Sequence, residues 1–128
     1  MNESPWHYFL EDEVKGLDKE FVALLDNARH IANVPFIISS GYRTPEHNAD
    51  VGGVNNSAHC TGHAIDLVVN DNMVAGSILK GLYSVGLTRI GLYFIKGFDG
   101  VMSWSHIHVD NDKTKPSISA WSKLEHYV

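Results

Sequence analysis

The sequence has one cysteine, Cys60, among 128 residues, so no disulfide can form within the chain and the redox compartment stays open. Long apolar runs are missing, and no stretch approaches the roughly 20 residues that a membrane-spanning helix needs. Basic residues are outnumbered by acidic ones, 10 against 15, and no basic stretch indicates a nucleic-acid partner. We therefore expect neither a membrane span nor nucleic-acid binding.

The N-terminus lacks the basic region followed by an apolar region that marks a secretory signal peptide. The chain has 44% apolar and 20% charged residues, as is usual for a globular domain. Its length suits one domain with a core of its own. We expect a single domain over residues 1–128, with an N-terminal arm at 1–16 and a C-terminal tail at 111–128.

Hydrophobic spacing predicts helices and strands in alternation. Asp18 is a helix N-cap candidate before apolar positions at helical spacing over residues 19–33, and Asp71 is one before residues 72–85. Shorter segments are a helix from Pro45 toward Asp50, a flexible loop marked by 52–53 and 55–56, strands at 36–39, 64–69, 88–95 and 104–109, and a C-terminal helix docked by Trp121 and Leu124. The expected fold is α+β, a small antiparallel sheet with two main helices on one side and the functional groove on the other.

Histidine is abundant, with eight residues, and two segments concentrate it. His59 and Asp66 are seven residues apart, with Gly62 between them to allow a tight turn. His106 and His108 are two apart and so point to one face of a strand. Imidazoles and a carboxylate are typical zinc ligands, and three of them leave a position at which water can be activated. The alternative is a set of unconnected polar residues on edge strands.

These segments resemble zinc peptidases that cut bacterial cell-wall peptides: D-alanyl-D-alanine carboxypeptidases and dipeptidases, and phage L-alanyl-D-glutamate endopeptidases. These enzymes share their metal site with lysostaphin-like enzymes and the hedgehog domain. The family string Ser-x-His-x-x-Gly-x-Ala-x-Asp is complete here as Ser57, His59, Gly62, Ala64 and Asp66. The resemblance extends to residues 40–45, 88–93 and 108–110 and covers roughly residues 6–110. It implies a hedgehog/DD-peptidase-like fold and one zinc ion held by His59, Asp66 and His108.

The resemblance also implies roles around the metal. Arg43 stands where relatives bind the substrate peptide, and a guanidinium can hold a carboxylate or stabilise charge on the cleaved carbonyl. The alternative is an exposed arginine in a turn. Ser57 is expected to contact substrate, or else to cap its loop. Asp110 is expected to orient a ligand histidine, as carboxylates near metal sites do.

The general base is the point at which this chain departs from the family. Many relatives carry Asp or Glu three residues before the last histidine ligand, and this chain has Ser105 there. His106 lies on the ligand face, where lysostaphin-like enzymes use a histidine, and its ordinary pKa suits proton transfer. We therefore expect His106 and Arg43 as the catalytic residues. The alternative is a solvated or merely supporting His106.

The expected function is a zinc metallopeptidase that hydrolyses peptidoglycan stem peptides, as a D-Ala-D-Ala carboxypeptidase or an L-Ala-D-Glu endopeptidase. The alternative is a non-catalytic zinc-binding module, of a wall-binding or phage structural kind, which Ser105 favours. We expect a monomer of endolysin type, made in the cytoplasm and acting on the wall after release in phage or prophage lysis, or as part of a virion.

Overall fold

The computed structural model describes residues 4–54 and 57–126. Residues 1–3, where a signal peptide would begin and the expected arm starts, lie outside the described residues. Residues 55–56 of the expected loop and residues 127–128 of the expected tail lie outside them as well. The elements in chain order are η1 (Glu11–Val14), α1 (Lys19–Ala32), β1 (Ile38–Ser40), α2 (Pro45–Asp50), η2 (Ala58–Thr61), β2 (Ala64–Val68), α3 (Asn72–Ser84), β3 (Arg89–Lys96), β4 (Met102–Asp110) and β5 (Ser119–His126).

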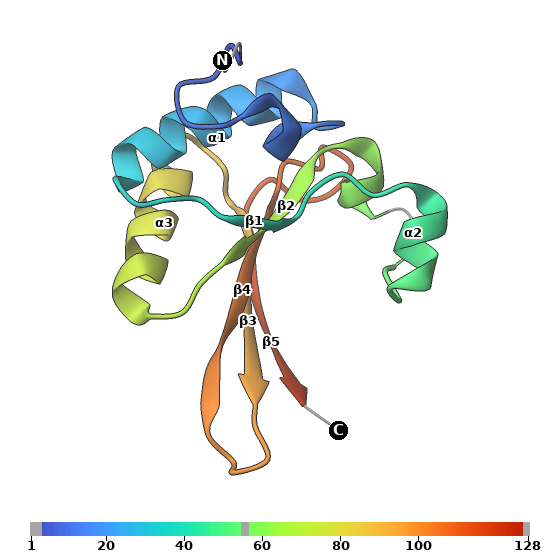
Figure 1. Ribbon diagram of the computed structural model, residues 1–128, viewed down its shortest axis with the longest axis vertical. Coiled ribbons are helices and arrows are strands. Elements are labelled where there is room, and N and C mark those ends of the chain that lie inside the picture. Colours follow the sequence, from blue (N-terminus) through green and yellow to red (C-terminus); the bar gives the residue numbers. More distant parts are fainter. Residues whose placement is uncertain (1–3, 55–56, 127–128) are drawn as a thin grey trace.

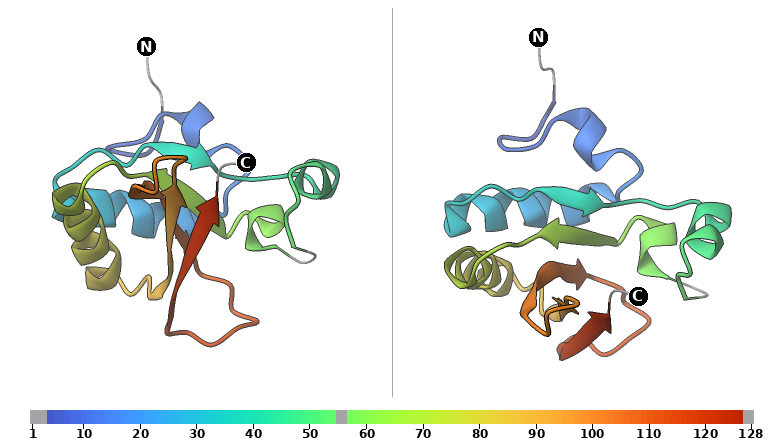
Figure 2. Two further views of the ribbon diagram at one scale, coloured as in Figure 1. Left: turned by 90° about the horizontal axis from the view of Figure 1, so that it is seen from below. Right: turned by 60° about the horizontal axis from the view of Figure 1, so that its bottom comes forward.

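The two long helices begin at the predicted caps. The Asp18 carboxylate accepts a hydrogen bond from the Phe21 N–H at 3.0 Å, and the Asp71 carboxylate accepts one from Val74 N–H at 2.7 Å. Helices α1 and α3 pack on each other and lie on one side of the sheet, as Figures 1 and 2 show. The expected α+β fold is therefore confirmed. No helix in the described part of the chain has the length and apolarity to cross a bilayer.

The sheet has the order β1-β2-β4-β3-β5. The first four strands in this order pair antiparallel, as expected, but β5 pairs parallel to β3 and makes the sheet mixed. The C-terminal helix expected around Trp121 and Leu124 is therefore wrong. The N–H and C=O groups on the outer edge of β3 need partners, and the tail supplies them as a strand. The β3–β4 hairpin and β5 project together from the body of the molecule (Figure 1).

Alternation along the central strands separates the core from the functional face. Ile107 and Val109 of β4 are fully buried in the core that the helices cover. His106 and His108 alternate with these two residues along the strand and therefore point to the opposite face. Asp66 of β2 lies directly opposite His108 in the antiparallel register. The register thus places a carboxylate and an imidazole side by side on the face away from the helices.

Candidate metal centre

A short turn positions His59 ahead of β2. The Ser57 hydroxyl accepts a hydrogen bond from the His59 N–H at 3.2 Å and caps η2. Gly62 ends the turn at φ 78°, and a Cβ there would lie 2.5 Å from the carbonyl oxygen of Gly16. Any larger residue would therefore be strained at position 62 and would collide with the backbone. This explains physically why the family string needs glycine between its histidine and its aspartate.

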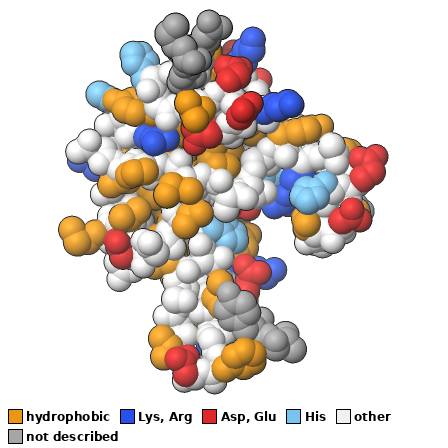
Figure 3. Space-filling model, in the orientation of Figure 1, with side chains coloured by type: hydrophobic (Ala, Val, Ile, Leu, Met, Phe, Trp, Pro, Cys, Tyr) orange, Lys and Arg blue, Asp and Glu red, His pale blue; other side chains and the backbone are white. Residues whose placement is uncertain are grey.

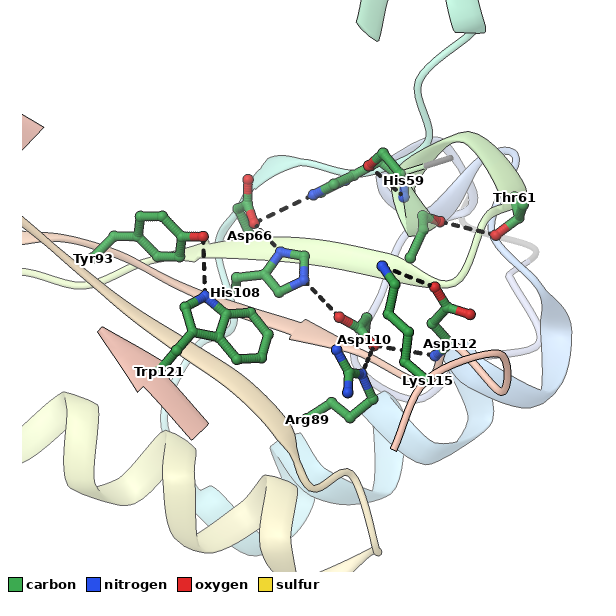
Figure 4. A network of polar contacts seen from close by, with 12 residues as sticks. His59, Thr61, Asp66, Arg89, Tyr93, His108, Asp110, Asp112, Lys115 and Trp121 are labelled. Atoms are coloured by element: carbon green, nitrogen blue, oxygen red, sulfur yellow. Dashed lines mark hydrogen bonds and ion pairs between the residues drawn. The ribbon is translucent and has the colours of Figure 1, made fainter. Parts of the chain in front are cut away.

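His59, Asp66 and His108 come together as one group of donor atoms. Each offers one ligand atom, and these atoms all lie within 4.8 Å of one another, which makes the group a candidate metal site. The Asp66 Oδ1 oxygen is 3.4 Å from Nε2 of His59 and 2.9 Å from Nδ1 of His108 (Figure 4). The other carboxylate oxygen, Oδ2, faces Nη2 of Arg43 and Nε2 of His106. Three residues that are distant in the sequence thus converge from η2, β2 and β4.

Hydrogen bonds outside the group assign the free nitrogen of each histidine. His59 Nδ1 donates to the carbonyl oxygen of Gly41 at 2.7 Å, which leaves the Nε2 lone pair facing Asp66. His108 Nε2 donates to Asp110 Oδ2 at 2.8 Å, which leaves Nδ1 facing Asp66. A metal-binding imidazole needs one nitrogen free and usually donates from the other to a carboxylate or carbonyl. The donor set therefore fits a divalent cation, and Asp110 lies where it was expected to orient His108.

The ionisation states within the group follow from competing effects. Burial raises the pKa of Asp66, but the hydrogen bonds to His108 and His59 outweigh it and hold that pKa well below the usual range. Burial lowers the pKa of His108, but its hydrogen bonds to Asp110 and Asp66 outweigh it and raise that pKa above the ordinary value. The carboxylate is ionised at neutral pH, and a bound cation would take the place of the proton on His108.

Arg43 is held against the metal group by three contacts. Its Nε donates to the Ser40 hydroxyl at 3.0 Å, Nη1 donates to Asn48 Oδ1 at 3.2 Å, and Nη2 lies 3.5 Å from Asp66 Oδ2. Its side chain is only 16% exposed. The alternative of an exposed arginine in a turn is therefore wrong.

His106 lies beside the group without joining it. Its ring stacks on Tyr93 with the ring centroids 4.4 Å apart, and its Nδ1 is 2.8 Å from the Ser105 hydroxyl. Its Nε2 is 4.0 Å from Asp66 Oδ2. Burial lowers the pKa of His106 and outweighs the opposing effect of Asp66, so the imidazole is neutral at neutral pH.

These side chains line one cleft of about 290 Å³. Its described lining residues are Arg43, Gly52, Gly53, Val54, Ser57, His59, Asp66, Tyr93, His106, His108 and Glu125. Ser57 thus both caps η2 and faces the cleft, so the two expectations for it are compatible. A larger hollow of about 880 Å³ between α2, η2 and Asp112 contains none of the three candidate ligands, and we assign the chemistry to the smaller cleft.

Sequence reasoning did not place five of these residues in the site: the loop residues Gly52, Gly53 and Val54, and the side chains of Tyr93 and Glu125. Tyr93 could have been found, because it lies two residues after Gly91 on a predicted strand and therefore on the same face as that glycine. In the structure this is the face of the histidines, since Gly91 pairs with His108 and Tyr93 with His106. Glu125 carried no such signal, since it lies in a segment expected to be helical. The place of Glu125 in the cleft depends on the pairing of β5 with β3, which no local pattern specifies.

Comparison with known proteins agrees with this geometry. The sequence profile of the Peptidase M15 family matches residues 9–110. The fold is similar to that of the L-Ala D-Glu endopeptidase ChiX of Serratia marcescens, with a TM-score of 0.50 and 18% sequence identity over 81% of this chain and 88% of that one. No sequence among the curated proteins matches significantly. The profile spans most of the chain, the resemblance drawn from its motifs is confirmed, and the chain belongs to the Peptidase M15 family.

Proposed function

We propose that the protein is a zinc metallopeptidase that hydrolyses peptide bonds in the stem peptides of bacterial peptidoglycan. The bond is of the D-Ala-D-Ala carboxypeptidase or the L-Ala-D-Glu endopeptidase type. The observation that carries the proposal is the convergence of two correctly oriented imidazoles and one carboxylate in a cleft. Family membership and the fold shared with an L-Ala D-Glu endopeptidase support it.

Two nitrogens and one oxygen suit zinc, which accepts such mixed sets in open tetrahedral sites. A zinc ion held by His59, Asp66 and His108 would supply a Lewis acid that polarises a peptide carbonyl and lowers the pKa of water. Asp110 would keep Nδ1 of His108 available by accepting the proton of its Nε2. Arg89 in turn fixes Asp110 through a 2.7 Å contact from its Nε.

Arg43 has donors left for a substrate. A guanidinium carries five N–H groups, and three are used toward Ser40, Asn48 and Asp66, which leaves one on each terminal nitrogen. These two can bind a substrate carboxylate or the oxygen of the cleaved carbonyl. Because the guanidinium is already fixed, little side-chain entropy is lost when substrate binds.

His106 is the proton-handling group in this proposal. Its Nδ1 shares a proton with the Ser105 hydroxyl, and the direction of that bond decides whether Nε2 accepts or donates. As an acceptor, Nε2 takes a proton from the attacking water. As a donor, it stabilises the negative charge of the tetrahedral oxygen. Stacking on Tyr93 holds the ring in place for either role.

Ser105 favours a second candidate, a zinc-binding module of the wall or of a virion that does not catalyse. Incubation with purified peptidoglycan, with and without a chelator, separates the two. The proposal expects chelator-sensitive release of new amino groups, and mass spectrometry of the fragments identifies the bond. His47→Ala, which changes an exposed histidine outside the cleft, is the matched control for His59→Ala. Zinc binding without release of amino groups would support the module instead.

A further inference from the structure

Glu125 is an acidic side chain of the cleft that the proposed chemistry does not use. Among the described residues that line the cleft, it and Asp66 are the acidic ones, and Asp66 belongs to the metal group. Glu125 is exposed. Within the described part of the chain it forms no hydrogen bond or ion pair. Its charge is therefore available to a ligand that enters the cleft.

The strand order puts Glu125 and Arg43 on opposite sides of the metal group. Arg43 follows β1 at one edge of the sheet, and Glu125 lies on β5 at the other edge. Between them lie β2 and β4, which carry Asp66 and His108, and then β3 with Tyr93. The cleft thus has a cationic end and an anionic end. Figure 3 shows histidine, acidic and basic side chains close together where the projecting strands meet the body.

The register places Glu125 on the functional face. Trp121 pairs with Gly91, and Glu125, four residues further along β5, points to the same side of the strand. Since β3 lies between β4 and β5, Glu125 is about 10 Å from the strand of the two histidines at the usual strand spacing. That distance matches about three residues of extended peptide. The Glu125 side chain also reaches back far enough for its charge to favour the protonated form of His106, although burial outweighs this effect on the pKa of that ring.

We propose that Glu125 is a specificity residue that binds an ammonium group of the peptide substrate two to three residues from the cleaved bond. The inference rests on the proposed function. Arg43 would bind a carboxylate of the same peptide. The opposite charges at the two ends of the cleft would then fix the direction in which the peptide chain crosses the metal group. The ammonium group comes from a diamino side chain or from a free N-terminus, and both offer the same chemistry to a carboxylate.

The test compares stem peptides that differ in this charge. The probes are the peptide L-Ala-γ-D-Glu-L-Lys-D-Ala-D-Ala with an acetylated N-terminus, the same peptide with norleucine in place of lysine, and each with a free N-terminus. The wild-type chain is expected to show a KM about three to five times lower for the lysine peptide than for its norleucine counterpart. A lower KM that follows the free N-terminus instead assigns the ammonium to the main chain and equally supports the proposal.

Substitution then assigns the preference to the carboxylate. Glu125→Gln is expected to abolish the preference, and Glu125→Lys to reverse it toward a peptide with glutamate in place of lysine. Glu20→Gln, an exposed carboxylate on α1, is the control that keeps it. A wild-type chain without preference, a preference that survives Glu125→Gln, or an equal loss of kcat on all peptides would overturn the proposal.

A binding measurement separates this inference from the proposed function. Calorimetric titration of the metal-free chain with the lysine and norleucine peptides is expected to show the same three- to five-fold difference, about that of an exposed ion pair. If no peptide is cleaved but the difference in binding persists and disappears in Glu125→Gln, peptide hydrolysis fails as the function and the ammonium site stands. If cleavage occurs without any charge preference, peptide hydrolysis stands as the function and the ammonium site is refuted.

Discussion

The two walls of the cleft differ in their coverage by the family profile and in their exposure to solvent. The first, the metal wall, comprises residues 57–66 and 106–110, which lie inside the part of the chain that matches the family profile. The second is β5, which lies beyond that match. His59 and Asp66 are 3% and 7% exposed, whereas Glu125 on β5 is exposed. The candidate metal ligands thus belong to the part of the chain that the family profile describes, whereas Glu125 belongs to a segment beyond it.

Trp121 connects the two walls. Its ring lies 5.6 Å from the His108 ring and 5.6 Å from the Arg89 guanidinium, measured to ring centroids, and its Nε1 donates to the Tyr93 hydroxyl at 3.1 Å. A side chain from the C-terminal strand therefore packs against the residues that orient a candidate metal ligand. Changes on the metal wall should alter metal binding and catalysis, whereas changes on β5 should alter stability and substrate preference.

The largest effect is expected for the metal wall. His59→Ala removes a donor that no neighbour can replace, so metal-dependent release of amino groups from peptidoglycan should fall on the order of 10³-fold or more. The His47→Ala control should keep full activity. Activity that survives in His59→Ala would mean that the group is not the reacting centre.

His106→Ala should separate chemistry from metal binding. The chain should still bind zinc, because His106 is not in the donor group, while kcat falls about 10²-fold or more through loss of proton transfer. Zinc binding and steady-state kinetics on the same sample check both statements. Unchanged kcat would refute the role given to His106.

Asp110→Asn should weaken the metal site without abolishing it. The amide keeps the shape of the side chain but loses the charge that fixes the His108 tautomer, so zinc affinity should fall about 10- to 100-fold. Competition with a chromophoric chelator measures it. An unchanged affinity would show that Asp110 is irrelevant to the orientation of His108.

Metal and proton compete for His108, and this sets the pH dependence. Because the pKa of His108 is raised, zinc must displace a proton, and apparent affinity should fall up to about ten-fold per pH unit below that pKa. In the metal-free chain the raised pKa stabilises the fold fully below the unfolded value, about 6.5, and this contribution is lost as pH rises through the folded pKa. Denaturant unfolding with and without zinc should therefore show opposite pH trends near neutrality, and parallel trends would contradict the assignment.

The smallest effect on chemistry is expected from the other wall. A Cβ at Gly91 would lie 2.4 Å from Trp121 Nε1, so Gly91→Ala should displace β5 and lower the free energy of unfolding by about 1–3 kcal/mol while zinc binding persists. Amide hydrogen exchange should accelerate along β5. Gly76→Ala on α3, where the added Cβ meets no atom within 4 Å, is the control and should stabilise the helix slightly. Unchanged exchange along β5 would show that the strand does not depend on this contact.

Local signals in the sequence predicted the starts of the two long helices and the shared face of His106 and His108, and the resemblance to a family supplied the choice of His59, Asp66 and His108 as ligands. Asp18 and Asp71 fixed the helix starts by their side-chain chemistry, and alternation at His106 and His108 put both rings on one face. The C-terminal strand was not predictable in this way. Its conformation follows from parallel pairing with β3, which begins 30 residues earlier in the chain at Arg89, and no spacing within the tail encodes that partner. Glu125 was missed for the same reason.

The most direct test of the central claim is a count of zinc ions per chain by native mass spectrometry. We predict one ion in the wild-type protein and in Glu125→Gln, and none in Asp66→Ala, since Asp66 Oδ1 lies between both imidazoles. An ion retained by Asp66→Ala, or a wild-type chain that binds none at excess zinc, would contradict the account.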